Sequence, residues 1–289
     1  MVRDKQNQKP KEDLLSTSAQ SAVAADARDV VAIARRGIYR YGAAVNSHDL
    51  LKGLAITVMV VDHTGRFFVD DNVWMRLVGR MAAPLFFFLV GYSGSYRFKS
   101  QILLLGIALS TISFLTSTEN GIGRILPLNI LLSFVLIKIV LDRWDPAAQF
   151  SDLLVTILVI LMVVSIPTYG FVVEYGSLGL CYAIGARLLA QRHPLARFWM
   201  CATVSVHFLF EMIALLIWNP SVPASILPYA IPCLAAAFGV NLAIFLNFRV
   251  RTFDIGCSWI RVPVMYVSRY SLQIYFFHLA AFMIVYRLI

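Results

Sequence analysis

The chain has 289 residues, of which 59% are hydrophobic and only 14% are charged, and its mean hydropathy is +0.74. These values exclude an ordinary soluble domain of this size and indicate a protein that crosses a membrane several times. The formal net charge of +9 does not indicate nucleic-acid binding, because the basic residues are spread through the connections between apolar runs, as membrane topology requires.

The first 48 residues precede the apolar part of the chain. Residues 1–26 are polar and of mixed charge, a composition that favours disorder. Residues 27–44 mix Val, Ile and Tyr with arginines, which is the pattern of a basic amphipathic segment on the cytoplasmic leaflet of a membrane. We therefore expect residues 1–48 to form a polar tail and an amphipathic cytoplasmic segment that contacts lipids, and residues 49–289 to form the transmembrane domain.

The rest of the chain contains nine apolar runs of about the length that a membrane-spanning helix needs. The sequence places them at 50–68, 78–96, 100–117, 125–142, 152–168, 172–190, 197–218, 226–247 and 265–287. The expected fold class is therefore all-α, a polytopic integral membrane bundle of about nine transmembrane helices.

The distribution of Lys and Arg predicts the orientation of this bundle. If the N-terminus is cytoplasmic, all 25 Lys and Arg fall on the cytoplasmic side except Arg66, Arg76, Arg80, Arg124 and Arg287. Such a bias is typical of proteins in the bacterial cytoplasmic (inner) membrane, with basic residues retained inside. Topology does not explain why Arg66, Arg76 and Arg80 lie close together on the opposite side.

The first apolar run carries four ionisable residues. Lys52 and His63 are eleven residues apart, so on a helix they project from one face and stand about 16 Å apart along the axis. Asp62 lies four residues before Arg66, which is the favoured order for an ion pair within a helix. Ionisable groups inside a membrane span are costly and point to a functional site.

Arg76 and Arg80 are also four residues apart, and like charges at this spacing repel each other. An anionic ligand between the two guanidinium groups would relieve the repulsion, and a phosphate or carboxylate suits such a pair. The alternatives are a contact with a lipid headgroup, or an ion pair of one arginine with Asp62, Asp70 or Asp71.

Two further sets of polar residues lie at helical spacing. Ser271, Tyr275 and His278 share a face of the last run, and a histidine there serves either as a base or as a packing residue bonded to a neighbouring helix. His207 and Glu211 are four residues apart and are expected to satisfy each other.

The chain shows none of the common patterns of cofactor binding. Its four cysteines have no metal-ligand spacing, and HxxxH, HExxH, Walker and GxGxxG motifs are absent from the sequence, so no metal is predicted. His63, His207 and His278 form no clear pairs at matching depths, as a haem-carrying bundle would need.

Three stretches resemble the TraX family of membrane acetyltransferases: LLKGLAITVMVVDHTGRFF, MRLVGRMAAPLFFFLVGY and LPLNILLSF. The matching residues include Lys52, Asp62, His63, Arg76, Arg80 and Asn129. That family is best known for acetylating the amino terminus of conjugative pilin from acetyl-CoA. The spacing of Lys52 and His63, with the Tyr275–His278 ending, is also similar to acyltransferases that O-acetylate envelope glycans.

The resemblance implies an integral membrane acyltransferase that moves an acetyl group from acetyl-CoA to a pilin-like amino terminus or to a hydroxyl of an envelope glycan. The expected catalytic residues are His63, Asp62, His278 and Tyr275. The expected substrate-binding residues are Lys52, Arg66, Arg76, Arg80 and Asn129. The alternative is a transporter or flippase for an anionic envelope precursor, although the sequence shows no repeated halves.

Overall fold

The computed structural model describes residues 44–69, 72–96, 100–116, 129–143, 175–218 and 223–288. The predicted polar tail and most of the amphipathic segment lie outside these residues, and so does the fifth apolar run, at 152–168. The account below concerns the unit that begins at Ala44.

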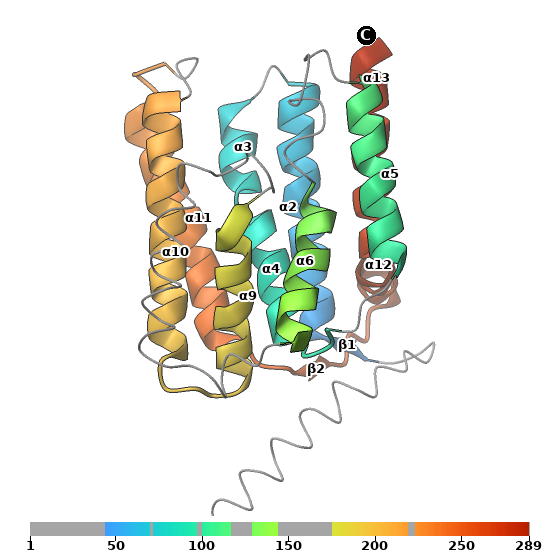
Figure 1. The fold of residues 1–289 in the computed structure, drawn as a ribbon, viewed down its shortest axis with the longest axis vertical. Helices are drawn as coiled ribbons and strands as arrows, with labels where there is room; N and C mark the ends of the chain where they lie inside the picture. The colour runs from blue at the N-terminus through green and yellow to red at the C-terminus, as the bar shows by residue number, and fades with distance from the viewer. Residues whose placement is uncertain are drawn as a thin grey trace, which may run out of the picture. The chain divides into compact units, whose positions relative to one another are not determined.

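The described part of the chain is built from helices (Figure 1). Most of them stand side by side along the vertical axis of the figure. They are α2 (Ser47–Phe67), α3 (Val73–Gly79), α4 (Ala82–Tyr92), α5 (Ser100–Thr116), α6 (Ile130–Arg143), α9 (Gly176–Ala190), α10 (Ala196–Ile213), α11 (Leu227–Asn247), α12 (Ser258–Arg269) and α13 (Ser271–Leu288). A π-helical turn, Ala214–Trp218, extends α10.

The structure confirms an all-α membrane protein. Among the described residues, four helical stretches are long and apolar enough to cross a bilayer, namely Val73–Tyr92, Ala196–Ile217, Leu227–Asn247 and Ser271–Leu288. The apolar helices α5 and α9 are shorter. The full set of nine spans and the cytoplasmic N-terminus stay predictions.

A short β-strand precedes α2, and a capping box forms at the N-terminus of this helix. Strand β1 (Val45–Asn46) pairs antiparallel with β2 (Thr252–Phe253), which lies after α11. The side chain of Asn46 accepts a hydrogen bond from the backbone N–H of Asp49 at 3.0 Å, and the Asp49 carboxylate accepts from the N–H of Asn46 at 3.1 Å. These reciprocal bonds satisfy backbone donors that α2 would otherwise leave unpaired.

The second apolar run, expected as one helix over 78–96, is broken in the structure. Helix α3 ends at Gly79, helix α4 begins at Ala82, and Arg80 and Met81 lie between them. Pro84 accounts for the break, because it has no N–H to bond to the carbonyl of Arg80 four residues earlier and its ring crowds that carbonyl. The break places Arg80 at a bend of the chain rather than within a regular helix.

Small residues allow the helices to approach closely, as is common in membrane proteins. A Cβ atom added to Gly91 of α4 would lie 2.0 Å from the carbonyl oxygen of Ala183 in α9. A Cβ atom on Gly79 of α3 would lie 2.2 Å from the Cβ of Asp62 in α2. The second contact matters for the site, because it fixes Asp62 against the end of α3, the helix that carries Arg76 and that Arg80 directly follows.

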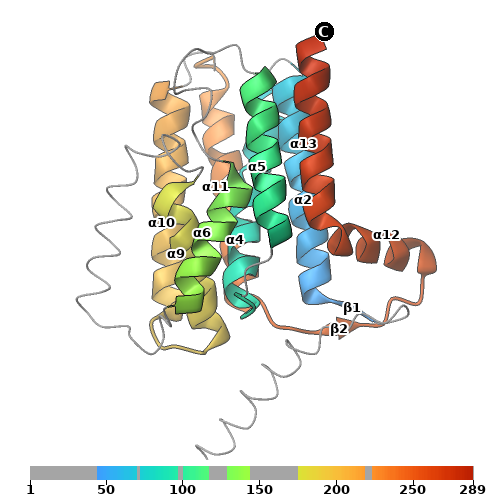
Figure 2. The ribbon, with the colours of Figure 1, turned by 45° about the vertical axis from the view of Figure 1, so that its right-hand side comes forward.

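The last apolar run was expected as one span over 265–287, but the chain turns at Tyr270 (Figure 2). Helix α12 runs crosswise beside the lower part of α2, above the two short strands, and α13 then rises beside α2. The hydroxyl of Ser268 donates a 2.5 Å hydrogen bond to Asp49 in the first turn of α2. This contact holds the end of α12 against the start of α2, so α13 begins there and runs along α2.

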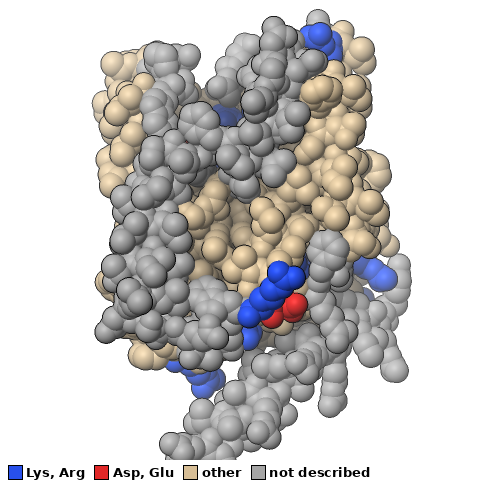
Figure 3. Space-filling view, viewed as in Figure 1, with Lys and Arg blue, Asp and Glu red and all other residues tan. Residues whose placement is uncertain are grey.

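Basic side chains gather at one end of the bundle. In Figure 3 most of the visible Lys and Arg lie at the lower end, below a tan surface that lacks charged residues. This is the end at which α2 starts and at which α6, α9 and α11 finish. The distribution agrees with the Lys and Arg bias of the sequence, and it is the arrangement that the predicted orientation requires.

Candidate functional site

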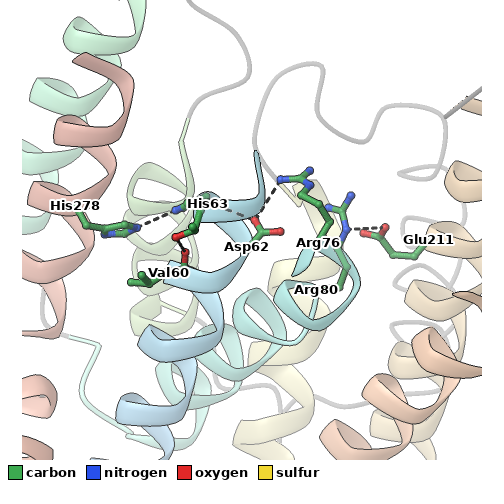
Figure 4. Close-up of polar contacts among 8 residues, drawn as sticks. Val60, Asp62, His63, Arg76, Arg80, Glu211 and His278 are labelled. Atoms are coloured by element: carbon green, nitrogen blue, oxygen red, sulfur yellow. Dashed lines mark hydrogen bonds and ion pairs between the residues drawn. The ribbon is translucent and has the colours of Figure 1, made fainter. Parts of the chain in front are cut away.

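A direct contact between two histidines from distant parts of the chain forms the centre of the candidate site (Figure 4). The Nδ1 atom of His63 in α2 lies 2.8 Å from Nε2 of His278 in α13, and the two rings stack with centroids 5.1 Å apart. The sequence had indicated no clear histidine pair, and that interpretation was wrong. The pair joins residues 215 positions apart, so helical spacing could not reveal it.

The hydrogen bonds determine which ring nitrogen carries a proton. Nδ1 of His278 lies 2.8 Å from the backbone carbonyl of Ile274, which only accepts, so this nitrogen is the N–H donor. In neutral His278, Nε2 then accepts a hydrogen bond from Nδ1 of His63. Neutral His63 is therefore left with a lone pair on its Nε2 atom, which is the nitrogen of the pair that can take up a proton.

Asp62 lies on the other side of this nitrogen. One carboxylate oxygen, Oδ2, is 3.9 Å from Nε2 of His63 and 3.4 Å from Nη1 of Arg76. The sequence had indicated Arg66 as the partner of Asp62, but the structure gives Asp62 to Arg76. The guanidinium of Arg66 lies instead over the ring of Phe67, 5.6 Å from its centroid. Close packing of α3 on α2 favours this cross-helix pair over the pair within α2.

A second group of polar residues continues from Arg80. Its Nε atom lies 3.2 Å from Oε2 of Glu211 in α10, and Oε1 of Glu211 lies 3.5 Å from Nε2 of His207. The hydroxyl of Tyr182 in α9 lies 3.1 Å from the other ring nitrogen of His207. The predicted contact between His207 and Glu211 is confirmed, but the sequence missed Arg80 and Tyr182 as members of the group.

Arg76 in α3 and Arg80 just after α3 thus each face a carboxylate of a neighbouring helix, Asp62 for Arg76 and Glu211 for Arg80. Ion pairs with protein carboxylates, which were an alternative for one of the two arginines, thus form at both, and the role of Arg76 and Arg80 in substrate binding stays a prediction. The histidine contact and the two ion pairs place ionisable side chains from α13, α2, α10 and the segment from α3 to Arg80 in a row across the bundle (Figure 4). Their side chains are 5% to 29% exposed, so these charges are largely shielded from solvent.

The remaining predicted site residues lie at different distances from the histidine pair. The ring of Tyr275 is buried, with its centroid 6.5 Å from that of His63 and 5.8 Å from that of His278. Lys52 lies nearer the start of α2, about 16 Å from His63 along the helix, as expected. The structure therefore brings Tyr275 to the site and leaves Lys52 near the end where basic residues gather.

The hydrogen bonds of the Asn129 side chain connect two helices. Its amide nitrogen donates to the carbonyl of Gly106 at 2.7 Å and contacts the hydroxyl of Ser110 at 2.8 Å, both on α5. Its oxygen accepts from the backbone N–H of Leu131 at 3.1 Å. The side chain thus caps α6 and ties it to α5, and its role in substrate binding stays a prediction.

A cavity of about 600 Å³ opens at the basic end of the bundle. Ser47, Phe248, Arg249 and Arg251 are among the residues that line it. Two arginines and an aromatic ring suit a ligand that carries phosphate groups. Among the described residues, no group of three or more His, Cys, Asp or Glu is placed to hold a metal ion.

Comparison with known proteins adds a family relationship to this geometry. The family model described as TraX protein matches residues 47–286, which is most of the chain. A stretch of 64 residues is 39% identical to an uncharacterized protein of Rickettsia prowazekii (strain Madrid E). That alignment covers 22% of this chain and 26% of the relative, so the chain spans about a quarter of that relative's length. No solved structure matches the chain.

Proposed function

Because the chain belongs to the TraX family of conjugation-related membrane proteins, we propose that it is an acetyltransferase that moves an acetyl group from acetyl-CoA to an amine or hydroxyl acceptor. The observation that carries this proposal is the orientation of the histidine pair, which leaves a basic nitrogen on His63 beside Asp62. A pilin-like amino terminus is the acceptor that the family favours, and an envelope glycan is the second candidate.

The proposed reaction needs one base that also acts as an acid. Nε2 of His63 removes a proton from the acceptor as its nitrogen or oxygen attacks the thioester carbonyl carbon. The bond from that carbon to sulfur then breaks, and Nε2 returns the proton to the leaving thiolate. The products are the acetylated acceptor and free CoA, and His63 is restored to its neutral form.

The neighbours of His63 suit this role. His278 accepts the hydrogen bond from Nδ1 of His63 and holds the ring with Nε2 directed away from the pair, so His278 is a positioning residue. The carboxylate of Asp62 stabilises the positive charge that His63 carries between the two proton transfers. Arg76 pairs with Asp62 at 3.4 Å, and its guanidinium is the proposed partner of the negative charge that develops on the thioester oxygen.

The donor is proposed to enter from the basic end of the bundle. Lys52 lies at that end, on the same face of α2 as His63, and its charge suits the donor phosphates. The cavity lined by Arg249 and Arg251 opens at the same end. With the predicted orientation this end faces the cytoplasm, where acetyl-CoA is made.

The experiment follows CoA release with a thiol reagent, using protein in nanodiscs and an amine peptide as acceptor. We expect His63→Ala to lower kcat by about 10²- to 10⁴-fold, because the loss removes proton abstraction. His193→Ala is the control, since His193 lies in the turn between α9 and α10. Similar kcat values for folded His63→Ala and wild type would contradict the proposed base.

A transporter or flippase for an anionic envelope precursor is the second candidate. The broken helix favours it, because discontinuous spans with charged residues at the break form the binding sites of many transporters. Flux of a fluorescent anionic lipid across proteoliposomes, blocked by Arg80→Ala and independent of acetyl-CoA, would favour this candidate over the acetyltransferase.

A further inference from the structure

Helix α12 is set apart from the bundle by its direction and by its surface. It runs crosswise to α2 and α13, whereas the neighbouring helices stand upright (Figure 2). Trp259, Val262, Tyr266 and Tyr270 follow each other at spacings of three and four residues, so they share one face. Their exposed fractions are 87%, 60%, 60% and 37%, so no described residue covers this face.

Most of the charges in and next to α12 are positive. The segment from Arg249 to Tyr270 contains Arg249, Arg251, Arg261 and Arg269, with Asp254 as its sole acidic residue. An apolar and aromatic face on a basic helix is the pattern of a helix that lies in a membrane surface, where Trp and Tyr are favoured at the boundary and Arg attracts anionic lipids.

The contact of α12 with α2 sets its depth. Ser268 near the end of α12 donates its hydrogen bond to Asp49, in the first turn of α2. Helix α13, which follows α12 after Tyr270, extends about 27 Å from Ser271 to Leu288 and is one of the described helices long and apolar enough to cross a bilayer. Helix α12 therefore lies at the level of one boundary of the bilayer, at the end where basic residues gather.

We propose that α12 is an interfacial helix that binds an anionic phospholipid leaflet, with the face of Trp259 and Tyr266 at the boundary of the acyl chains and with Arg261 and Arg269 at the headgroups. Helix α12 is joined to α13 by Tyr270 alone. The depth of α12 in the leaflet thus sets the position of α13 along the membrane normal. It sets the position of His278 relative to His63 in the same way.

The test uses the fluorescence of Trp259, which is one of five tryptophans in the chain. The tryptophan fluorescence of the wild-type protein and of the Trp259→Phe variant is measured in nanodiscs that contain brominated lipid. The difference between the two signals is the fluorescence of Trp259 alone. We expect the Trp259 component to be quenched by lipids brominated near the headgroup end of the chain and to be protected from aqueous iodide. A second variant combines Trp259→Phe with Val262→Trp, which moves the tryptophan of α12 to another position on the same face. Quenching by brominated lipid should be restored in this variant.

The preference for anionic lipid is tested in the same nanodiscs. Brominated phosphatidylglycerol should quench the Trp259 component at least twofold more than brominated phosphatidylcholine at equal mole fraction. Arg261→Gln with Arg269→Gln should abolish that difference. Arg143→Gln with Arg197→Gln is the matched control, because these exposed arginines lie at the same end of the bundle on α6 and α10.

Three results would overturn the proposal. Quenching of Trp259 by iodide and not by lipid would place α12 in water. Protection from both quenchers would mean that protein covers this face, either another part of the chain or a second copy. Equal quenching by the two lipids in the wild type would remove the anionic preference.

Discussion

Gly79→Ala should damage both the stability and the activity of the protein, because Gly79 is where α3 touches Asp62. A Cβ atom at this position would lie 2.2 Å from the Cβ and 2.5 Å from Oδ1 of Asp62, far inside van der Waals contact. Overpacking of this kind costs about 1–3 kcal/mol. The strain is relieved only if α2 and α3 move apart, and that movement lengthens the 3.4 Å contact between Asp62 and Arg76.

Gly53→Ala is the matched control. Gly53 lies in α2, the helix that carries Asp62, but a Cβ atom there meets no atom within 4 Å, so the change should leave the protein as stable as wild type or slightly more so. The free energy of unfolding is measured in detergent micelles, and CoA release is measured in nanodiscs. Equal stability and equal kcat for Gly79→Ala and Gly53→Ala would refute the proposed close approach of α3 to Asp62.

Three further predictions follow from other contacts. Lys52→Ala should raise the KM for acetyl-CoA in steady-state assays and leave kcat nearly unchanged, because Lys52 lies about 16 Å from His63. Ser268→Ala should lower the free energy of unfolding by about 1.5–3 kcal/mol, since Asp49 loses a buried hydrogen bond. Glu211→Gln should destabilise the protein by about 3 kcal/mol in the same unfolding assay, because it removes a buried charge that faces the Arg80 guanidinium.

The sequence predicted the helices well where helical periodicity alone decides the outcome. Helices α5 and α11 lie within a residue or two of the expected runs, and Lys52 and His63 share α2 as their spacing required. The break at Arg80 was missed, although the missing N–H of Pro84 could have indicated it. The crosswise helix α12 was missed as well, since its apolar residues continue directly into those of α13.

The site was predicted residue by residue, but its contacts were not. Spacing along one helix selected Arg66 as the partner of Asp62, whereas close packing of α3 supplies Arg76 instead. The contact of His63 with His278 depends on how α13 is placed beside α2, which no local pattern contains. Sequence patterns thus identified the ionisable residues in the apolar runs, and tertiary packing determined which of them meet.

The measurement that tests the central claim most directly is mass spectrometry of an acceptor peptide with a free amino terminus. The peptide is incubated with acetyl-CoA and either wild-type protein or His63→Ala in nanodiscs, and the folding of both proteins is checked separately. The account predicts acetylation of the terminal amine by wild type and a rate at least 100-fold lower with His63→Ala, the lower end of the contribution expected from a general base. Acetylation at equal rates by both proteins, or none by a folded wild type with either an amine or a glycan hydroxyl acceptor, would contradict it.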